Sequence, residues 1–375
     1  MKRIYCLLLS MALIFSLAAC SSPAETNEAT TPAASTAEKK ETESGSTSNQ
    51  STAADTTAAS SGEVVKDTEG TEFQLPMKLD RIIVLNSNCY ELICVLGMED
   101  KVIGVADTVT FPASAESKDK YGKWTEPNAE LIIEAKPDAV FVYGSSIDPA
   151  IRKQIEDAGI TTIALDFYRL HDIPTEVVAL GKMLGAEEKA EEYVAFINKY
   201  CDMIEERTAN VEKVKVYYEG YTDYKTAGQG SGAYELLDLA GVQNLAADLT
   251  ESSPEINDEW VLEQNPDMIV KNCSSTKMIL GQGVADTAAA QEYYQTLVSR
   301  PGWDGTNAVK NQKVMMIASR IGTSPQGLVV GSLYIAKMAY PDLFTDIDPA
   351  EVHKELMDTY YGGGADEGIW YYDGK

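Results

Sequence analysis

Short runs of apolar, mostly β-branched residues recur along the chain and alternate with segments whose apolar positions follow a helical spacing. The runs that predict strands span 81–85, 102–106, 138–143 and 161–165, and later 215–219, 267–271 and 313–318. The segments with helical spacing include 90–96 and 149–158, and later 234–240, 258–264 and 327–339. An alternation of buried strands and helices predicts parallel sheets that are covered by helices on both faces.

The segment between the two series of strands is poor in strand-forming residues. From Ile173 to Val211 its apolar side chains recur at helical spacing, as at Ala190, Ile197 and Ile204. At about 1.5 Å per residue, a helix over 187–210 is on the order of 35 Å long. Such a helix is long enough to run along two neighbouring lobes as one rigid element.

These patterns predict an α/β protein with two Rossmann-like lobes, whose parallel sheets are joined by one long backbone helix. The N-terminal lobe is expected over 63–172 and opens with a hairpin at 64–76. The linking helix is expected within 173–211, and the C-terminal lobe over 212–375. Because lobes joined by a helix close less than lobes joined by strands, the cleft between them is expected to be stiff.

The chain begins with the features of a bacterial signal peptide. A basic start, Met1-Lys2-Arg3, precedes an apolar stretch at 4–15 that is too short for a membrane span. The stretch ends in Leu17-Ala18-Ala19-Cys20, which looks like a lipobox. We therefore expect 1–20 to be a lipoprotein signal peptide and Cys20 to be the lipidated residue. An ordinary secretory signal is the alternative.

A long polar segment follows the signal peptide. Residues 21–62 are rich in Ser, Thr, Ala, Glu and Asn and contain no aromatic side chain. They cannot bury enough apolar surface to offset the entropy of ordering, so a disordered tether is expected. The protein is then expected outside the cytoplasm, anchored by lipid to the outer face of the cytoplasmic membrane. The tether favours a Gram-positive cell, where no outer membrane retains the protein.

The composition excludes several classes of function. A net charge of −27 disfavours nucleic acid and anionic membrane surfaces as partners, so the lipid is the one membrane contact expected. Two histidines cannot build a three-histidine site for a bare transition ion, so a metal must arrive already chelated. Common hydrolase, metalloprotease and P-loop motifs do not occur, so catalysis is not expected. Four further cysteines match no zinc spacing, and their pairing stays open: Cys89, Cys94, Cys201 and Cys273.

A duplicated motif connects the two predicted lobes with a known family. Residues 122–132 and 136–140 read GKWTEPNAELI and KPDAV, and the second lobe has NDEWVLEQNPDMIV at 257–270. This repeated pattern resembles the periplasmic binding proteins of ABC importers for iron-siderophore complexes, cobalamin and heme. Three further segments agree with the same family, at 67–83, 239–245 and 334–344.

The resemblance implies an ABC permease and its ATPase as partners. In the family, one surface glutamate of each lobe docks into arginine pockets of the permease, and the matching positions here are Glu130 and Glu259. Two carboxylates on separate rigid lobes suit bidentate bonds to arginine. The alternative is that both are solvated acids favoured by the helix dipole. A monomer without an intrinsic cofactor is expected.

Ligand contacts are expected in the loops that follow the strands, because ligands of parallel sheets lie beyond the carboxyl ends of the strands. The candidates of the first lobe are Asn88, Tyr90, Tyr143, Tyr168 and Arg169, with Ser145 and Phe167 beside them. Those of the second lobe are Tyr221, Tyr224 and Arg320, with Lys225 and Asn272 beside them. Tyrosines suit a bulky amphipathic chelate, and the arginines suit carboxylates, hydroxamates or catecholates. Packing in the core is the alternative for each tyrosine.

Together with the resemblance, these residues predict a binding protein that captures a ferric siderophore or a related metal chelate for import. A corrinoid such as cobalamin, or heme, is the alternative ligand. His171 lies near Tyr168 and is the candidate axial ligand for heme. From different classes, a chelatase-like enzyme and a heme-relay adhesin stay open.

Overall fold

The computed structural model describes residues 62–362 and 367–375, which belong to one compact unit. The expected signal peptide, the lipidated Cys20 and the tether up to residue 61 lie outside the described residues. Within the described part, no helix combines the length and the apolar character that crossing a bilayer requires.

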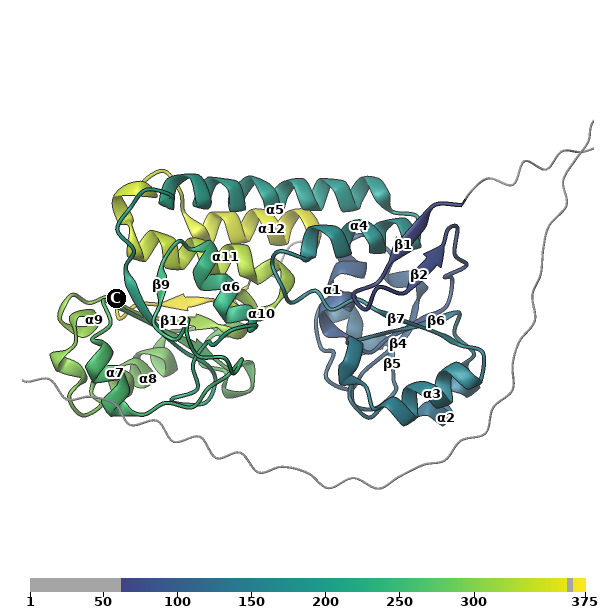
Figure 1. Ribbon diagram of the computed structural model, residues 1–375, viewed down its shortest axis with the longest axis horizontal. Coiled ribbons are helices and arrows are strands. Elements are labelled where there is room, and N and C mark those ends of the chain that lie inside the picture. Colours follow the sequence, from purple (N-terminus) through teal and green to yellow (C-terminus); the bar gives the residue numbers. More distant parts are fainter. Residues whose placement is uncertain (1–61, 363–366) are drawn as a thin grey trace, which may run out of the picture. The chain divides into compact units, whose positions relative to one another are not determined.

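A five-stranded parallel sheet forms the centre of the N-terminal lobe (Figure 1). Its strands, in spatial order, are β5 (Asp119–Lys120), β4 (Val102–Val105), β3 (Ile82–Val84), β6 (Ala139–Val142) and β7 (Thr161–Ala164). The helices that belong to it are α1 (Ser87–Val95), α2 (Ala129–Ala135) and α3 (Pro149–Asp157). The hairpin expected at the start is present as β1 (Val64–Lys66) and β2 (Glu72–Gln74), which pair antiparallel.

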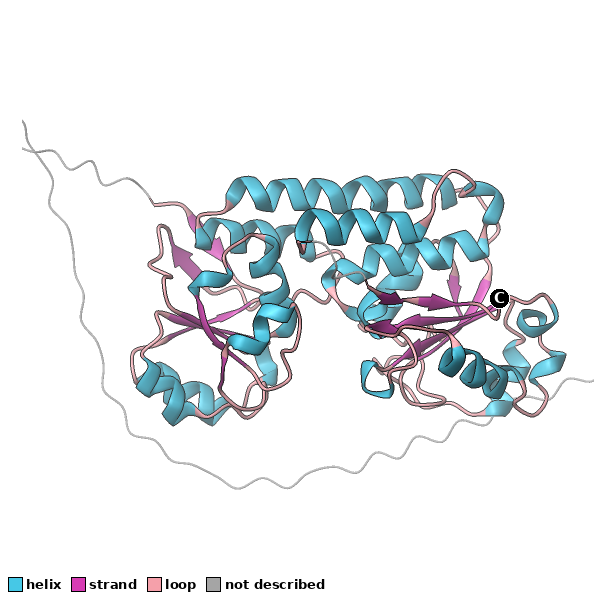
Figure 2. Ribbon diagram, turned by 180° about the vertical axis from the view of Figure 1, so that it is seen from behind, coloured by secondary structure: helices cyan, strands magenta, loops and turns pink. Residues whose placement is uncertain are grey.

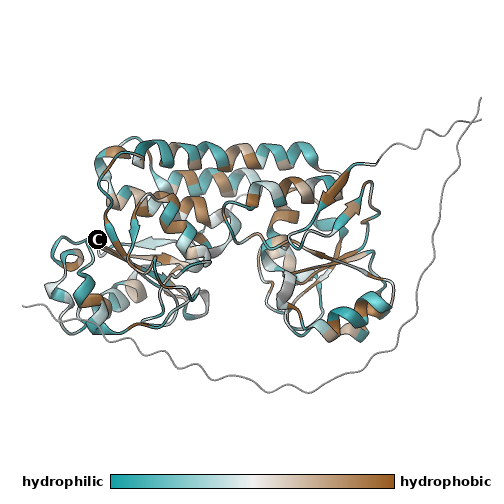
Figure 3. Ribbon diagram, viewed as in Figure 1, coloured by the Kyte–Doolittle hydropathy of each residue, from teal (hydrophilic) through white to brown (hydrophobic). Residues whose placement is uncertain are grey.

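Burial explains why the central strands consist of uninterrupted apolar runs. Every residue of β3 and of β6 is buried, because helices cover both faces of the sheet. The hydropathy colouring in Figure 3 shows the same pattern, with the strands brown and the outer faces of the helices teal. The parallel register of β3 with β4 and β6 brings the carboxyl ends of these strands to one edge.

Two helices link the lobes, α4 (Ile173–Leu184) and α5 (Glu187–Thr208). Gly185 ends α4 in the left-handed conformation, with φ of 75°, which a residue without Cβ adopts at little cost. The 22-residue helix α5 packs against α4, and against α6 and α11 of the second lobe. The prediction of one long backbone helix is confirmed, and the helix ends two residues before the expected position.

The C-terminal lobe is built around a second five-stranded sheet (Figure 2). Its strands, in spatial order, are β14 (Tyr371–Tyr372), β12 (Val314–Ala318), β10 (Met268–Cys273), β8 (Lys215–Glu219) and β9 (Gln243–Asn244). The short strands β11 (Gly281–Gln282) and β13 (Gly368–Ile369) pair apart from it. Its helices are α6 (Gly232–Leu239), α7 (Asp258–Gln264), α8 (Ala288–Val298), α9 (Asn307–Lys310), α10 (Ser319–Thr323), α11 (Pro325–Ala339) and α12 (Pro349–Tyr360).

The two-lobe α/β fold predicted from the sequence is confirmed, with one addition at the end of the chain. Strand β14 pairs antiparallel with β12 and covers the edge that β12 otherwise exposes. Its Tyr371 also stacks on Tyr334 of α11, with ring centroids 4.8 Å apart. The aromatic tail is therefore part of the second sheet, which periodicity alone does not predict for two residues. The boundaries at 172/173 and 211/212 stay predictions.

Candidate ligand-binding cleft

A cavity of about 490 Å³ lies where the two lobes face each other. Its walls come from segments that follow the carboxyl ends of β3 and β4 in the first lobe, and of β10 and β12 in the second. The first lobe contributes Ser87, Asn88, Glu91, Thr108, Thr110 and Phe111. The second lobe contributes Thr276, Met278, Leu280, Gly281, Gln282, Ala318, Ser319, Arg320 and Ser324. The lining is rich in hydroxyl and amide groups.

The turn between β3 and α1 fixes the first wall of the cavity. Asn86 caps α1, since its Oδ1 accepts hydrogen bonds from the backbone N of Asn88 and of Cys89 at 2.8 and 3.2 Å. The Nδ2 of Asn86 donates to the carbonyl of Leu165 after β7, and the Nδ2 of Asn88 donates to the carbonyl of Phe167. Two buried amides thus join the ends of β3 and β7, which lie on either side of β6, so this wall is held in place before any ligand arrives.

An ion pair crosses the cavity from one lobe to the other. Nη2 of Arg320, in α10 directly after β12, lies 2.7 Å from Oε1 of Glu91 in α1. The guanidinium carbon of Arg320 lies 3.4 Å from the ring centroid of Phe111, so the cation rests on an aromatic face. Glu91 is 4% exposed. Glu91 and Phe111 were not among the predicted ligand residues, although Glu91 is the one charged residue within the apolar stretch 89–96.

Two of the predicted ligand residues line this cavity, Asn88 and Arg320. Tyr143 lies next to it, because its hydroxyl is 3.0 Å from Oγ of the lining residue Ser87, and burial raises the pKa of Tyr143 to about 12. Tyr90 does not line the cavity: it is fully buried, and its hydroxyl lies 2.9 Å from Oγ of Ser114.

The other first-lobe candidates lie outside the cavity lining, Ser145 after β6 and the rest in the loop after β7. The guanidinium of Arg169 lies over the ring of Tyr168 at 5.6 Å, and the pKa of Arg169 is raised chiefly by the charge of that tyrosine. Phe167 is fully buried, with φ of 54°. The side chain of Ser145 lies outside the described residues. His171 is highly exposed and its Nδ1 lies 2.9 Å from Oδ1 of Asp172, away from the cavity.

The second-lobe candidates other than Arg320 also lie outside the cavity lining. Tyr221 is 43% exposed. The hydroxyl of Tyr224 donates to Asp258 at 2.5 Å, and Lys225 pairs with Glu255 at 3.1 Å. Asn272 is buried and its Nδ2 donates to the hydroxyl of Tyr218 at 2.6 Å. The side chains of Tyr224, Lys225 and Asn272 are thus engaged within their own lobe.

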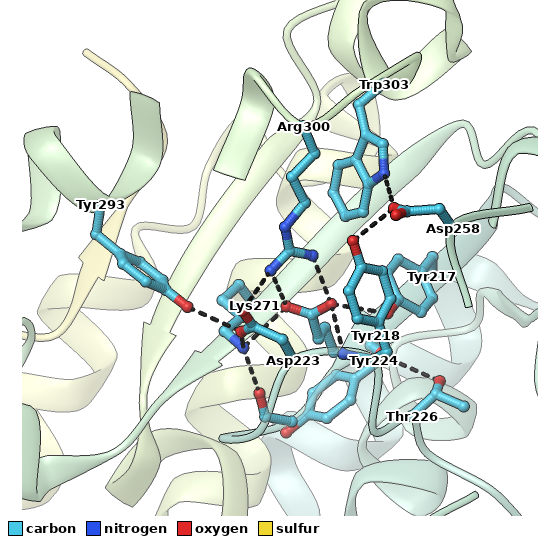
Figure 4. A network of polar contacts seen from close by, with 12 residues as sticks. Tyr217, Tyr218, Asp223, Tyr224, Thr226, Asp258, Lys271, Tyr293, Arg300 and Trp303 are labelled. Carbon is cyan, nitrogen blue, oxygen red and sulfur yellow. Dashed lines mark hydrogen bonds and ion pairs between the residues drawn. The ribbon is translucent and has the colours of Figure 1, made fainter. Parts of the chain in front are cut away.

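A network of charges joins β8 to the loop that carries Tyr221 and Tyr224, and two of its members, Glu219 and Lys271, are buried (Figure 4). Glu219, at the end of β8, accepts hydrogen bonds from both terminal nitrogens of Arg300 at 2.7 and 3.1 Å. Nζ of Lys271 lies 2.9 Å from Glu219 and 3.0 Å from Asp223 in the same loop. Burial by itself raises the pKa of Glu219, but Arg300 and Lys271 outweigh it and hold this pKa below its ordinary value.

The duplicated sequence motif is also duplicated in structure. Helices α2 and α7 are both seven residues long and begin at an asparagine cap, Asn128 and Asn257, that accepts from the third backbone N beyond it. Both end in a left-handed residue. Glu130 and Glu259 occupy the same place in the first turn, and both are exposed. The two predicted docking residues thus stand on matched helices in separate lobes.

The four cysteines that the structure describes are all free thiols. Burial raises the pKa of Cys94 to about 11 and that of Cys201 and Cys273 to about 12, and it also raises the pKa of Cys89. Within residues 62–362 and 367–375, no three His, Cys, Asp or Glu residues are placed to hold a metal ion. The lining of the cleft contains hydroxyls, amides, one carboxylate and one cation.

A family model described as periplasmic binding protein matches residues 82–321. Among curated relatives, an uncharacterized ABC transporter substrate-binding lipoprotein of Bacillus subtilis, YvrC, is 28% identical over 75% of this chain and 87% of its own length. The molybdate-binding protein MolA of Haemophilus influenzae is 22% identical over 80% of this chain and 90% of its own length. The vitamin B12-binding protein of Pectobacterium atrosepticum is 22% identical over 53% of this chain and 73% of its own length.

The fold is shared with solved structures. The TroA-like periplasmic binding protein FepB from Veillonella parvula superposes with a TM-score of 0.69 at 23% identity. The match covers 83% of this chain and 99% of that one. The two-lobe arrangement with a linking helix is therefore a property of a group of known structures.

Proposed function

Because the chain belongs to the periplasmic binding protein family, a family of substrate-binding transport proteins, we propose that it is the substrate-binding lipoprotein of an ABC importer. It captures a ferric siderophore or a related metal chelate between its lobes and delivers it to the membrane permease. The metal is part of the cargo, so the binding site recognises the organic shell and its charge.

One observation carries this proposal, the polar cavity of about 490 Å³ at the strand ends of both lobes. This volume lies within the range of about 300 to 1,000 Å³ that is typical of small-molecule sites. Arg320 supplies a planar cation that pairs well with the carboxylate, hydroxamate or catecholate oxygens of an iron chelate. The hydroxyls of Ser87, Thr108 and Thr110 supply hydrogen bonds to the same kind of oxygen.

Delivery is assigned to Glu130 and Glu259. They are exposed on matched helices of separate lobes, and each can accept a bidentate bond from an arginine of the permease. Two docking points on separate lobes allow the permease to bind one relative position of the lobes more tightly than others. Lipidation at Cys20 keeps the protein next to the permease, as the lipoprotein YvrC supports.

The proposal is tested by titrating residues 62–375 with ferric chelates while following tyrosine and tryptophan fluorescence. A ferric trihydroxamate and a ferric tricatecholate are the first ligands, and at least one is expected to bind at micromolar concentration or below. An Arg320→Gln variant is expected to lose most of that affinity, with Arg207→Gln as the control, because Arg207 pairs with Asp346 outside the cavity lining. If no chelate changes the fluorescence and a sugar or a peptide binds tightly, a metal chelate is excluded as the ligand.

A corrinoid is the second candidate, because the vitamin B12-binding protein is among the relatives. A corrinoid is a larger ligand than most siderophores, so its binding requires the lobes to move apart. Cobalamin in the same titration series decides between the two, and hemin and molybdate complete the set. Heme binding through His171 requires a site outside the cavity, since this residue does not line it.

A further inference from the structure

We propose that Glu91 is a built-in competitor for the ligand of Arg320, so that the empty cleft is held by an ion pair that an anionic ligand must replace. This inference rests on the proposed function only in taking the cavity as the place where the ligand enters. It adds a selection rule, because a ligand must bring negative charge to Arg320 to take the place of Glu91.

The geometry supports an exchange of partners. Glu91 belongs to α1 of the first lobe and Arg320 to α10 of the second, so their 2.7 Å contact ties the lobes together across the cavity. Both residues also line the cavity, so a ligand inside it reaches the pair directly. Phe111 supports the guanidinium from below at 3.4 Å. Phe111 belongs to the first lobe, as Glu91 does, but to a different segment, so its contact with Arg320 can persist when the ion pair with Glu91 breaks.

The bonding of Arg320 is incomplete. A guanidinium has five N–H donors. Among the described residues, Nε of Arg320 is buried and makes no hydrogen bond. A buried donor without an acceptor is costly, and an oxyanion that binds two edges of the guanidinium removes that cost. The ion pair joins Oε1 of Glu91 to Nη2 of Arg320. An anion of the ligand that binds two nitrogens of the guanidinium is therefore the better partner.

Charge then decides which ligands gain from the exchange. An anionic ligand replaces one carboxylate by another and adds hydrogen bonds, while a neutral ligand leaves Arg320 without a counter-charge if it separates the pair. The opposite role, in which Glu91 orients Arg320 for the ligand, predicts the reverse effect of removing the carboxylate charge. The two roles are therefore separated by the sign of one affinity change.

The experiment uses the near-isosteric variant Glu91→Gln in residues 62–375, with the exposed Glu188→Gln as a matched control for charge. Affinity is measured by calorimetry for an anionic ferric tricatecholate and for neutral cobalamin. We expect Glu91→Gln to bind the anionic chelate about tenfold more tightly, since a charge-assisted bond of the competitor is lost. A neutral ligand forms no charge-assisted bond with Arg320, so its affinity is expected to gain less from Glu91→Gln than that of the anionic chelate, and all affinities of Glu188→Gln are expected to stay within about twofold of the original.

The second part of the experiment combines Glu91→Gln with Arg320→Gln. If Glu91 competes for Arg320, the gain of about tenfold disappears in the Arg320→Gln background. Unchanged or weakened binding of the anionic chelate by Glu91→Gln would overturn the inference, and so would a gain that persists without Arg320.

A third measurement does not depend on any ligand. X-ray scattering of the ligand-free variants is expected to show a wider distribution of distances for Glu91→Gln than for the original chain. If no ligand binds the original chain, the proposed function fails, and the scattering still tests the inter-lobe pair. If the distance distributions of Glu91→Gln and of the original chain are identical, the ion pair does not hold the lobes together, whatever the ligand is. Circular dichroism before each titration confirms that the variants are folded.

Discussion

Lys271 shows at the scale of one residue how this protein keeps charge in its interior. Its side chain is 1% exposed, and its ammonium group contacts Glu219 and Asp223 and donates to the carbonyl of Gly220 at 2.8 Å. Removing one partner of such a pair leaves a buried charge without compensation. The network is therefore costly to break, although replacing all its members by apolar residues need not be.

We expect Lys271→Met to lower the free energy of unfolding by about 3 to 5 kcal/mol, because Glu219 then loses one of its two buried cationic partners. Urea unfolding followed by circular dichroism measures the change. The control is Lys277→Met in an exposed position six residues away, which is expected to change the same free energy by no more than about 0.5 kcal/mol. Equal effects of both variants would contradict the network.

The same carboxylates predict how the stability depends on pH. The pKa values of Glu219 and Asp223 are lowered in the folded chain against the opposing effect of burial, by Arg300 and Lys271 for Glu219 and chiefly by Lys271 for Asp223. Their stabilising contribution is complete above the ordinary values of 4.5 and 3.8, and it is lost as the pH falls through the lowered values. Urea unfolding of the original chain and of Lys271→Met at pH 7 and at pH 3 measures this dependence. The difference in the free energy of unfolding between the two chains is expected to be smaller at pH 3 than at pH 7.

At the scale of the element, α2 and α7 are two copies of one device. Each is a short helix with an asparagine cap, and each presents a glutamate from its first turn to solvent. An exposed glutamate at a helix N-terminus is also favoured by the helix dipole, so position alone does not assign a role in docking. The docking role needs a measurement that separates ligand binding from transport.

We expect Glu130→Gln and Glu259→Gln each to reduce uptake through the permease severalfold while leaving ligand affinity unchanged, because the glutamates lie outside the cavity. Uptake by cells and calorimetry on the purified chain measure the two quantities. The matched controls are Glu134→Gln and Glu263→Gln, exposed on the same helices one turn later. If the control variants also lose uptake, the effect comes from the loss of any negative charge on these helices and not from docking by Glu130 and Glu259.

At the scale of the whole molecule, the proposed attachment to the membrane depends on one atom, the thiol sulfur of Cys20. We expect Cys20→Ala to release the protein from the membrane fraction into the medium, because no lipid can then be attached. Cys6→Ala, within the apolar stretch of the expected signal peptide, is the control and is expected to stay membrane-bound. Fractionation with an antibody against the chain reads both. Retention of Cys20→Ala on the membrane would exclude the lipid anchor.

Two of the predicted ligand residues line the cavity, and the reason is visible in the residues themselves. Arg320 and Asn88 follow predicted strands, and the cavity lies at the ends of those strands, whereas their contact with a ligand stays a prediction. The same rule pointed to Tyr90, which instead turns into the core, because a residue after a strand also begins a helix with a buried face. Glu91 and Phe111 escaped notice, since nothing in their neighbours along the chain reveals that they meet Arg320.

Local patterns in the chain were enough for the two lobes, the long helix between them and the matched glutamates. The periodicity of strands and helices and the short motifs depend on residues within one element, so they can be recognised without knowing which elements pack together. The partners of Arg320, the free state of the cysteines and the antiparallel β14 depend on contacts between segments far apart in sequence. Such contacts follow from how the elements pack together, so they became visible only in the folded chain.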